Sequence, residues 1–395
     1  MSIIFVESTS ARTKLLPLTY TRPIAQIRIG ILTITEKWSR LLDSTDCGYK
    51  TAVYLQSKYT LPQKTDANTL WINSNVLPNP ELVTTIQSLQ AGEALFSGDQ
   101  LISSRGSKES TYDKKKVFNG EISQVIYPWD IFLLNGKEIQ NDFNLITKGK
   151  KSEPINDPHT ITYGKDIFLE KGASVKAAVL NAEYGPIYIG KDAEIQEGAV
   201  IRGPFALCQE SIVGMGGKVR GDVTVGPYSK IGGEVSKSIL FGFSNKAHDG
   251  YLGNSIIGEW CNLGAGTSNS NLKNNYAPVK MWNYESRQFD ETGLQFCGLI
   301  MGDHSKAGIN TMFNTGSTVG VSANLFGEGF PRQIIPSFSW GGSRGLMTYR
   351  FDKAIETIRA VMSRRDLELS EEDHEILKYI FDVTSEVRIW EKQSK

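Results

Sequence analysis

Eight aliphatic residues recur at every sixth position between residues 189 and 231, and this repeat restricts the fold more than any other feature of the chain. They are Ile189, Ile195, Ile201, Leu207, Val213, Val219, Val225 and Ile231. Aliphatic residues make up about a fifth of an average chain, so eight consecutive matches by chance are very improbable. A six-residue period is typical of a hexapeptide parallel β-helix, a solenoid whose short strands turn a corner at every repeat.

The register returns at Ile257 and Leu263 and again, more weakly, at six-residue spacing from Met301 to Leu325. It breaks between residues 235 and 256 and between residues 268 and 295. Breaks in a solenoid are usually loops that project from a corner, and such loops often carry binding residues. A tolerated insertion is the alternative interpretation. His248, one of only four histidines, lies in the first break, so we expect it on a projecting loop.

The segments on either side of the repeat have a different character. Residues 1–146 alternate strand-like stretches such as "IIFVES" with helix-like stretches such as "ELVTTIQSLQ", which predicts an α/β domain. Residues 147–160 are polar and contain proline, which indicates a linker. The β-helix is expected over 161–335. Apolar residues at helical spacing within 336–395 predict a helical tail.

Composition excludes several classes of function. The chain has 43 Lys and Arg residues against 43 Asp and Glu residues, so no overall field favours nucleic acid or an anionic membrane. No apolar run reaches the ~18 residues of a membrane span, and the apolar run near the N-terminus is too short for a signal peptide. The four cysteines show no metal-binding or disulfide spacing. We therefore expect a cytoplasmic protein with four small, buried cysteines.

A solenoid of this kind has no wide internal cavity, so an active site must lie on its outside. Grooves between neighbouring solenoids of a cyclic homotrimer are the most economical place for it. Neutral imidazole, with an ordinary pKa near ~6.5, suits His248 to accept a proton near neutral pH. Asn262 and Asn271 are candidates to hydrogen-bond a sugar, and Tyr251 is a candidate to pack on its ring. His304 is the rival base.

The stretch "KAHDGYLGNSIIGEWCNLGAGTSNSN" resembles the acetyltransferase motif of the bifunctional N-acetylglucosamine-1-phosphate uridyltransferase (GlmU) family. This resemblance implies a left-handed β-helix that trimerises behind a nucleotidyltransferase domain. It also implies acetyl transfer from acetyl-CoA to the amine of a hexosamine phosphate, without a covalent acyl-enzyme. The residues that it marks are His248 as base, Tyr251, Asn262 and Asn271 as sugar contacts, and Ala265, Gly266 and Lys306 on the coenzyme side.

The chain departs from that family at two places. The phosphate-binding residues fall in a region of different spacing, which leaves Arg202, Lys218, Arg220 and Lys237 as unranked candidates. Ile309 stands where the family has a serine that contacts the coenzyme. Glu234 is a candidate to orient the imidazole, and a solvated corner is the alternative for it.

The N-terminal region lacks the glycine-rich loop with which sugar nucleotidyltransferases cradle phosphates, because no glycine precedes Gly30. The stretch "ARTKLLPLTYTRPIAQIRIG" still resembles the segment that follows that loop, and it is similar to a GlmU-like group of Bacteroidetes nucleotidyltransferases. The candidates to bind the nucleotide are Arg12, Lys14 and Arg22, and the candidates to bind Mg²⁺ are Asp99 and Asp130. A basic rim and, for Asp130, a cap at a helix start are the alternatives.

Four hypotheses follow from these observations. The first is a bifunctional enzyme of nucleotide-sugar synthesis that uses an NTP, a sugar phosphate and acetyl-CoA. The second is an acetyltransferase with a degenerate N-terminal domain. The third is a sugar-1-phosphate nucleotidyltransferase whose β-helix serves assembly alone, and the fourth is a non-catalytic scaffold.

Overall fold

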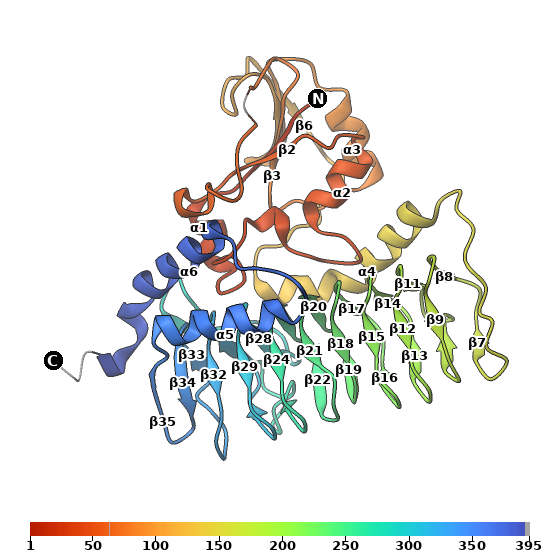
Figure 1. The fold of residues 1–395 in the computed structure, drawn as a ribbon. Coiled ribbons are helices and arrows are strands. Elements are labelled where there is room, and N and C mark those ends of the chain that lie inside the picture. Colours follow the sequence, from red (N-terminus) through yellow and green to blue (C-terminus); the bar gives the residue numbers. More distant parts are fainter. Residues whose placement is uncertain (63, 392–395) are drawn as a thin grey trace. The chain divides into compact units, whose positions relative to one another are not determined.

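Residues 1–62 and 64–391 are described by a computed structural model (Figure 1). The chain divides into two compact units. Unit 1 contains Met1–Ile27 and Leu32–Asp130, and unit 2 contains Arg28–Ile31 and Ile131–Lys395. This confirms the predicted architecture of an α/β domain followed by a parallel β-helix and a helical tail. The predicted boundaries, 1–146 and 161–335 around a linker at 147–160, stay a prediction.

Unit 1 is built on a mixed six-stranded sheet in the order β2-β1-β3-β5-β4-β6. The pairs β2/β1, β1/β3 and β4/β6 are parallel, and β3/β5 and β5/β4 are antiparallel. The strands are β1 (Ile3–Val6), β2 (Cys47–Lys50), β3 (Leu70–Asn73), β4 (Glu93–Ser97), β5 (Gln100–Arg105) and β6 (Lys114–Val117). Because β1 and β3 are parallel neighbours, their carboxyl ends, Val6 and Asn73, meet at one edge.

Short helices join these strands. They are α1 (Thr9–Lys14), η1 (Ile24–Gln26), α2 (Ile34–Leu41), η2 (Val53–Leu55) and α3 (Pro80–Gln87). Helix α2 begins with a capping box in which Thr33 and Glu36 exchange side-chain and backbone hydrogen bonds. Residues 122–127 form no strand, since Gln124 makes only an isolated bridge to Val76 before α4 (Pro128–Thr147) begins.

Unit 2 is a parallel β-helix with three faces, which are named here in the order in which each coil crosses them. Face one has the order β22-β19-β16-β13-β10-β7, face two β33-β31-β28-β23-β20-β17-β14-β11-β8, and face three β35-β34-β32-β29-β24-β21-β18-β15-β12-β9. Beyond β22, the short pair β25 (Ser268–Asn269) and β30 (Met312–Phe313) lies next along the solenoid.

The strands of the three faces have the following bounds. Face one contains β7 (Ile161–Tyr163), β10 (Val179–Asn181), β13 (Val200–Arg202), β16 (Lys218–Val219), β19 (Glu234–Ser236) and β22 (Tyr251–Gly253). Face two contains β8 (Ile167–Leu169), β11 (Ile187–Ile189), β14 (Phe205–Leu207), β17 (Val223–Val225), β20 (Ile239–Gly242), β23 (Ile256–Glu259), β28 (Leu299–Met301), β31 (Ser317–Val319) and β33 (Ile334–Ile335). Face three contains β9 (Ser174–Val175), β12 (Glu194–Ile195), β15 (Ile212–Val213), β18 (Lys230–Ile231), β21 (Asn245–Lys246), β24 (Asn262–Leu263), β29 (Lys306–Ala307), β32 (Asn324–Leu325), β34 (Ser339–Gly342) and β35 (Gly345–Thr348).

The six-residue repeat forms the core of the solenoid, as predicted. All eight aliphatic residues of the repeat are at most 4% exposed. The weaker repeat from Met301 to Leu325 is buried to the same degree. These side chains belong to one continuous apolar cluster along the inside of the coils. Stacking of successive coils therefore buries the apolar column that no single coil can bury alone.

The first break in the register is not a projecting loop, and this expectation is wrong. Residues 234–253 form the strands β19, β20, β21 and β22 of regular coils. The period changes there because neighbouring inward positions lie four to six residues apart, as from Ile231 to Val235 and then to Leu240. His248 therefore lies on a corner of the solenoid itself.

The second break does project. Residues 270–298 leave the coils and form the antiparallel hairpin of β26 (Lys280–Asn283) and β27 (Gln288–Glu291). The chain returns to face two at β28. This part of the sequence interpretation is confirmed.

Helices cover part of unit 2, as Figure 1 shows for α4 and α5. Asn135 of α4 donates a hydrogen bond to the Asp222 carbonyl and accepts one from the Gly30 amide. The short segment Arg28–Ile31 is held against the coils, where Thr224 donates to the Gly30 carbonyl. After β35, the tail contains α5 (Phe351–Ser363), α6 (Glu371–Val383), η3 (Ser385–Val387) and η4 (Ile389–Glu391), which confirms its helical character.

Two further findings bear on the expectations from composition. None of the described helices is long and apolar enough to cross a membrane. All four cysteines are free, and Cys208, Cys261 and Cys297 are buried, but Cys47 is only half-buried. The expectation of four buried cysteines is therefore wrong for Cys47, which lies on β2 at the edge of its sheet.

Candidate functional site

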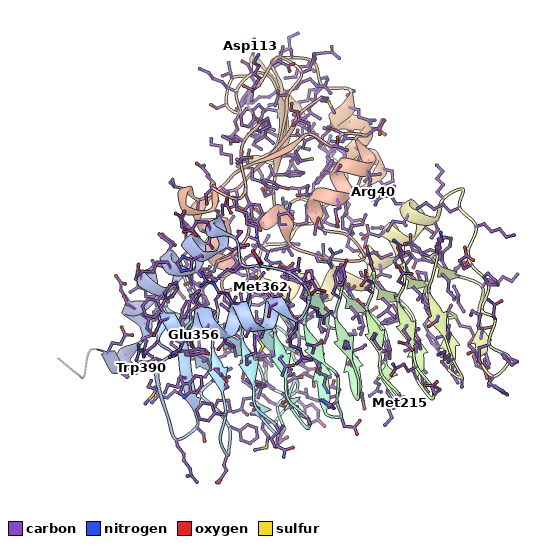
Figure 2. The ribbon with its side chains drawn as sticks, in the orientation of Figure 1. Arg40, Asp113, Met215, Glu356, Met362 and Trp390 are labelled. Atoms are coloured by element: carbon purple, nitrogen blue, oxygen red, sulfur yellow. The ribbon has the colours of Figure 1, made fainter. Side chains whose placement is uncertain are left out.

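His248 lies on the corner between β21 of face three and β22 of face one, and its side chain is exposed. Met215 occupies the equivalent place on a corner two coils earlier and projects from the edge of the solenoid, 75% exposed (Figure 2). A side chain at this position therefore points outward into solvent. The side chain of His248 is therefore accessible at this edge.

The coenzyme-side candidates stack on the same edge as His248. The Gly266 amide donates to the Asp249 carbonyl at 3.0 Å, and the Asn310 amide donates to the Ala265 carbonyl at 2.7 Å. Three consecutive coils thus present His248, then Ala265 with Gly266, then Ile309 with Asn310, about 4.8 Å apart from coil to coil. Ile309 is 72% exposed at the place expected for a serine.

Tyr251 and Asn271, which lie far apart in the sequence, are brought into contact. The Asn271 amide donates to the Tyr251 hydroxyl at 2.9 Å and to the Asn254 side-chain oxygen at 2.8 Å. Burial raises the pKa of Tyr251, so its hydroxyl stays protonated and can donate to a ligand. Asn262, on β24, is exposed.

The basic candidates for a phosphate lie on face one. The register of β13 and β16 pairs Ile201 with Val219, and Arg202 and Arg220 are the next residues on the two coils. Arg220 forms a 3.0 Å ion pair with Glu234, which is itself in register with Tyr251. The Arg202 guanidinium lies 4.5 Å from the ring centre of Tyr184. Glu234 therefore contacts an arginine beside the sugar candidates.

The other basic candidates on this side make separate contacts. Lys237 lies 3.9 Å from the carboxylate of Asp222, while Lys218 is exposed on β16. Lys306 turns toward the backbone, where its ammonium donates to the carbonyls of Trp260 and His304 at 2.8 and 2.9 Å. Burial lowers the pKa of Lys306 to about 8. It fits a role in holding the coils better than a direct coenzyme contact.

His304, the rival base, lies on the opposite side of the coil, at the corner between faces two and three. Its backbone is left-handed, with φ +62°, and its ring is parallel to that of Trp260 at 6.3 Å between centres. Trp260 in turn stacks on Phe243, and Phe243 stacks on Tyr228. A histidine within a ring stack of this kind has a packing role that His248 lacks.

Unit 1 contains a cavity of about 480 Å³ at the carboxyl ends of β1 and β3. Its lining includes the hydroxyls of Ser8 and Ser10 near the start of α1, and Lys14 at the end of that helix. Lys14 is the single cationic side chain that the described residues contribute to the lining. The cavity has the size of a small-molecule site.

Amide side chains that sequence reasoning missed also line this cavity. Gln100 and Gln124 exchange two amide hydrogen bonds, of 3.1 and 2.7 Å. Asn73 and Asn75 lie beside them at the end of β3. No motif marks these residues, because they come together only when β5 and the approach to α4 meet the end of β3.

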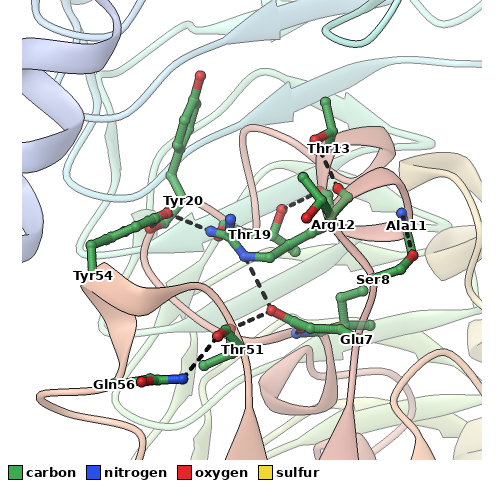
Figure 3. Close-up of polar contacts among 12 residues, drawn as sticks. Glu7, Ser8, Ala11, Arg12, Thr13, Thr19, Tyr20, Thr51, Tyr54 and Gln56 are labelled. Atoms are coloured by element: carbon green, nitrogen blue, oxygen red, sulfur yellow. Dashed lines mark hydrogen bonds and ion pairs between the residues drawn. The ribbon is translucent and has the colours of Figure 1, made fainter.

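The other two basic candidates of unit 1 are not free to meet a triphosphate. Arg12 pairs with the buried carboxylate of Glu7 at 3.1 Å and also donates to the Thr19 carbonyl and the Tyr54 hydroxyl (Figure 3). Glu7 directly follows β1, and burial raises its pKa although Thr51, the Ile24 amide and Arg12 oppose this. Arg22 is 5% exposed. These contacts favour the alternative of a structural basic rim.

The carboxylates considered for Mg²⁺ do not form a metal site in the structure. Asp99 is exposed in the turn between β4 and β5. Asp130, the third residue of α4, accepts hydrogen bonds from the amides of Ile126 and Tyr127, both at 2.8 Å. Asp130 is thus part of the cap at the helix start, but as the third helical residue that accepts from the preceding amides and not as the N-cap itself. Across residues 1–62 and 64–391, no three His, Cys, Asp or Glu side chains are grouped to hold a metal.

Comparisons with known proteins agree with the resemblance expected from the sequence. Residues 3–151 match the family described as sugar nucleotidyl transferase. The chain is 33% identical over 229 residues to the bifunctional protein GlmU of Methanocaldococcus jannaschii. This match covers 55% of this chain and 49% of that protein. It is also 32% identical over 144 residues to a bifunctional sugar-1-phosphate nucleotidylyltransferase/acetyltransferase of Sulfurisphaera tokodaii. This second match covers 36% of this chain and 35% of that protein.

The chain spans half or less of the length of these two curated relatives. Among solved structures, a UDP-N-acetylglucosamine acyltransferase from Arabidopsis matches with a TM-score of 0.28 and 14% identity, over 54% of this chain and 80% of that chain. A TM-score this low carries no inference about the function of this chain. The resemblance to bifunctional sugar-phosphate transferases rests on the sequence matches.

Proposed function

We propose that this chain is a bifunctional sugar-phosphate transferase whose solenoid unit moves an acetyl group from acetyl-CoA to the amine of a hexosamine phosphate. The observation that carries this proposal is the edge between faces three and one. There an exposed His248 lies one coil from Ala265 and Gly266 and three residues before Tyr251, whose hydroxyl accepts a hydrogen bond from Asn271. The sequence relatives named as bifunctional nucleotidyltransferase/acetyltransferase proteins support the same assignment.

The residues of the edge divide the work of acetyl transfer. The neutral imidazole of His248 accepts a proton from the amine as its nitrogen attacks the thioester carbonyl. The carbon–sulfur bond then breaks, and the imidazolium returns the proton to the departing thiolate. Tyr251, Asn262 and Asn271 bind the sugar hydroxyls, and Arg220, beside Arg202, meets the phosphate. The backbone at Ala265 would bind the thioester end of acetyl-CoA, since the amides of Gly264, Gly266 and Thr267 already donate within the coils.

Unit 1 transfers a nucleotidyl group from an NTP to a sugar 1-phosphate in this proposal, and the family match over residues 3–151 supports it. Lys14, Ser8 and Ser10 would bind phosphate oxygens at the carboxyl end of β1. Asp99 and Asp130 do not fit a Mg²⁺ site, so no step is assigned to a metal there. The pairing of Arg12 with Glu7 favours a second candidate, in which unit 1 binds a nucleotide without transferring it.

The proposed assembly is a homotrimer in the cytoplasm. A solenoid edge with exposed His248 and Ile309 forms one wall of a site, and a neighbouring copy in a closed trimer would supply the other wall. Three equivalent sites would result. Sedimentation of the full chain tests the trimer directly.

The deciding experiment follows free thiol release from acetyl-CoA with glucosamine 1-phosphate as acceptor. His248→Ala is expected to lower the rate by about 10²- to 10⁴-fold, which is the usual contribution of a general base. His159→Ala, at an exposed position before the solenoid, is the matched control and should behave as wild type. Equal rates for wild type and His248→Ala would exclude His248 as the base.

A second assay follows pyrophosphate release from UTP or dTTP with several sugar 1-phosphates. Release by the wild type supports nucleotidyl transfer by unit 1. Nucleotide binding without release would instead favour the degenerate form of unit 1. Release of pyrophosphate without any acetyl transfer would leave the β-helix an assembly device.

A further inference from the structure

A lysine occupies a place in the apolar column inside the solenoid. Lys246, on β21, is in register with Ile231, a core residue of the preceding coil. On the following coil, Asn245 pairs with Asn262, which brings Lys246 beside the core residue Leu263. Lys246 is 1% exposed. Side chains in register on neighbouring parallel strands point the same way, so Lys246 points into the solenoid.

This burial is costly for a charged side chain. Burial lowers the pKa of Lys246 to about 8, and only the charge of Asp249 opposes the effect. An isosteric apolar residue at such a place is often neutral or stabilising relative to a buried charge. Stability of the column therefore does not account for a lysine there.

Among the described residues, the ammonium of Lys246 makes one hydrogen bond, and the acceptor belongs to the proposed base His248. The ammonium donates to the backbone carbonyl of His248 at 2.5 Å. The bond comes from inside the solenoid, while the imidazole of His248 is exposed outside. The hydrogen bond from Lys246 thus restrains the peptide group between His248 and Asp249 from the inside of the solenoid.

The corner that carries His248 lacks the turn that closes comparable corners. In four other corners between faces three and one, as in the corner of His248, successive inward side chains lie six residues apart. In each of these four, the third residue after the first inward side chain has a left-handed backbone, with φ between 55° and 75°. These residues are Gly198, Gly216, Gly266 and Asn310. The corresponding residue after Lys246 is Asp249, which is not among the left-handed residues of the described chain.

The usual backbone bond is missing there as well. At three of those corners the residue after the left-handed one donates to the carbonyl three residues earlier, at 3.3 Å for Ala199 and at 3.1 Å for Gly217 and Thr267. Within the described residues, Gly250 makes no such bond to Ala247. Gly250 instead has φ +121°, and a Cβ there would lie 2.1 Å from the Thr267 carbonyl oxygen. The Lys246 side chain closes this irregular corner from within.

We propose that Lys246 is a positioning residue that fixes the orientation of His248 by holding its carbonyl from inside the solenoid. The inference rests on the proposed role of His248 as base. Without this hydrogen bond the corner would be more mobile, and the imidazole would move relative to the attacking amine. A displacement of about 1 Å is enough to lower the rate on the order of 100-fold. Binding of the sugar and the coenzyme, by residues on other corners and strands, would change little.

The test compares Lys246→Met with Lys246→Arg in the full chain. Lys246→Met is expected to lower kcat for acetyl transfer by about 10- to 100-fold with KM changed less than about twofold. Its melting temperature should equal or exceed that of the wild type. Lys246→Arg keeps a donor and should recover part of kcat. Lys191→Met, which removes a lysine that is 56% exposed on the outside of an earlier coil, is the control.

A double variant separates positioning from general loosening. If Lys246 acts through the imidazole, Lys246→Met should have no further effect in a His248→Ala background. An additive loss, or a fall in melting temperature that parallels the fall in kcat, would overturn the proposal.

A second readout does not depend on activity. Amide hydrogen exchange in residues 244–252 should accelerate in Lys246→Met and stay unchanged in Lys191→Met. If the wild type transfers no acetyl group, the proposed function fails, while exchange still decides whether Lys246 holds the corner. Unchanged exchange in Lys246→Met would overturn the inference even in an active enzyme.

Discussion

The two units place their charged side chains in opposite ways. In unit 1 the basic residues that follow β1 are mostly used internally, since Arg12 pairs with Glu7 and Arg22 is buried. In the solenoid the side chains around His248 are exposed along one edge, and the internal charge, Lys246, supports that edge. A repetitive scaffold therefore shows its site as a departure from the repeat. A layered domain hides its site among contacts that form only on folding.

The largest effect is expected from removal of the internal carboxylate of unit 1. Glu7→Gln leaves the Arg12 guanidinium without its buried counter-charge, and breaking a buried pair in this way typically costs about 3–5 kcal/mol. Urea denaturation should show this loss of stability. Glu328→Gln disturbs an ion pair with Arg344 in which both side chains are more than 80% exposed, and it should change little. Equal effects would show that Arg12 is not a structural cation.

The next test concerns Lys14, the one cation that the described residues contribute to the cavity lining. Lys14→Met removes a charge-assisted contact to phosphate, which is worth about 1.5–3 kcal/mol, so nucleotide affinity should fall by about 10- to 100-fold. Calorimetric titration with UTP measures this. Lys64→Met, at an exposed position of the same unit, is the control. Unchanged affinity would move the nucleotide away from the cavity at β1 and β3.

Much of the solenoid could be predicted from the sequence because its period is a direct consequence of its geometry. Each face contributes one inward side chain, and these side chains recur about every six residues. The repeat is therefore visible in the sequence from Ile189 to Leu325. The same logic misread the first break. Where the spacing between inward residues shortens from six to four, the period shifts although the chain stays in the solenoid. The sequence alone does not distinguish this change from an inserted loop.

The candidate site could be predicted only where residues lie close in sequence or in a motif. His248 and Tyr251 are such a pair. The contact of Tyr251 with Asn271 needed the resemblance, since 20 residues separate them. Lys246 was missed because a lysine near a polar stretch is normally expected in solvent. Only its register with Ile231 shows that its side chain points inward. Glu7 was missed because its partners come from other segments of unit 1.

A smaller effect is expected at the sugar side of the edge. Tyr251→Phe removes the hydroxyl to which Asn271 donates, and a hydrogen bond of this kind contributes about 0.5–1.5 kcal/mol. KM for the hexosamine phosphate should rise by about 2- to 10-fold while kcat changes less. Steady-state kinetics with a varied acceptor measures both. Tyr276→Phe, on a tyrosine that is 65% exposed in the projecting segment, should behave as wild type.

The smallest effect concerns pH and returns to the internal lysine. The folded-state pKa of Lys246, about 8, lies below its ordinary value of 10.5, so between these values the unfolded chain binds more protons than the folded chain. Stability contributed by this group must therefore rise with pH in that window, by roughly 1 kcal/mol between pH 8 and pH 9. The difference in unfolding free energy between wild type and Lys246→Met isolates this contribution, because Lys306 is common to both proteins. A difference that is flat over this pH range would mean that the ammonium of Lys246 is not buried as the solenoid register places it.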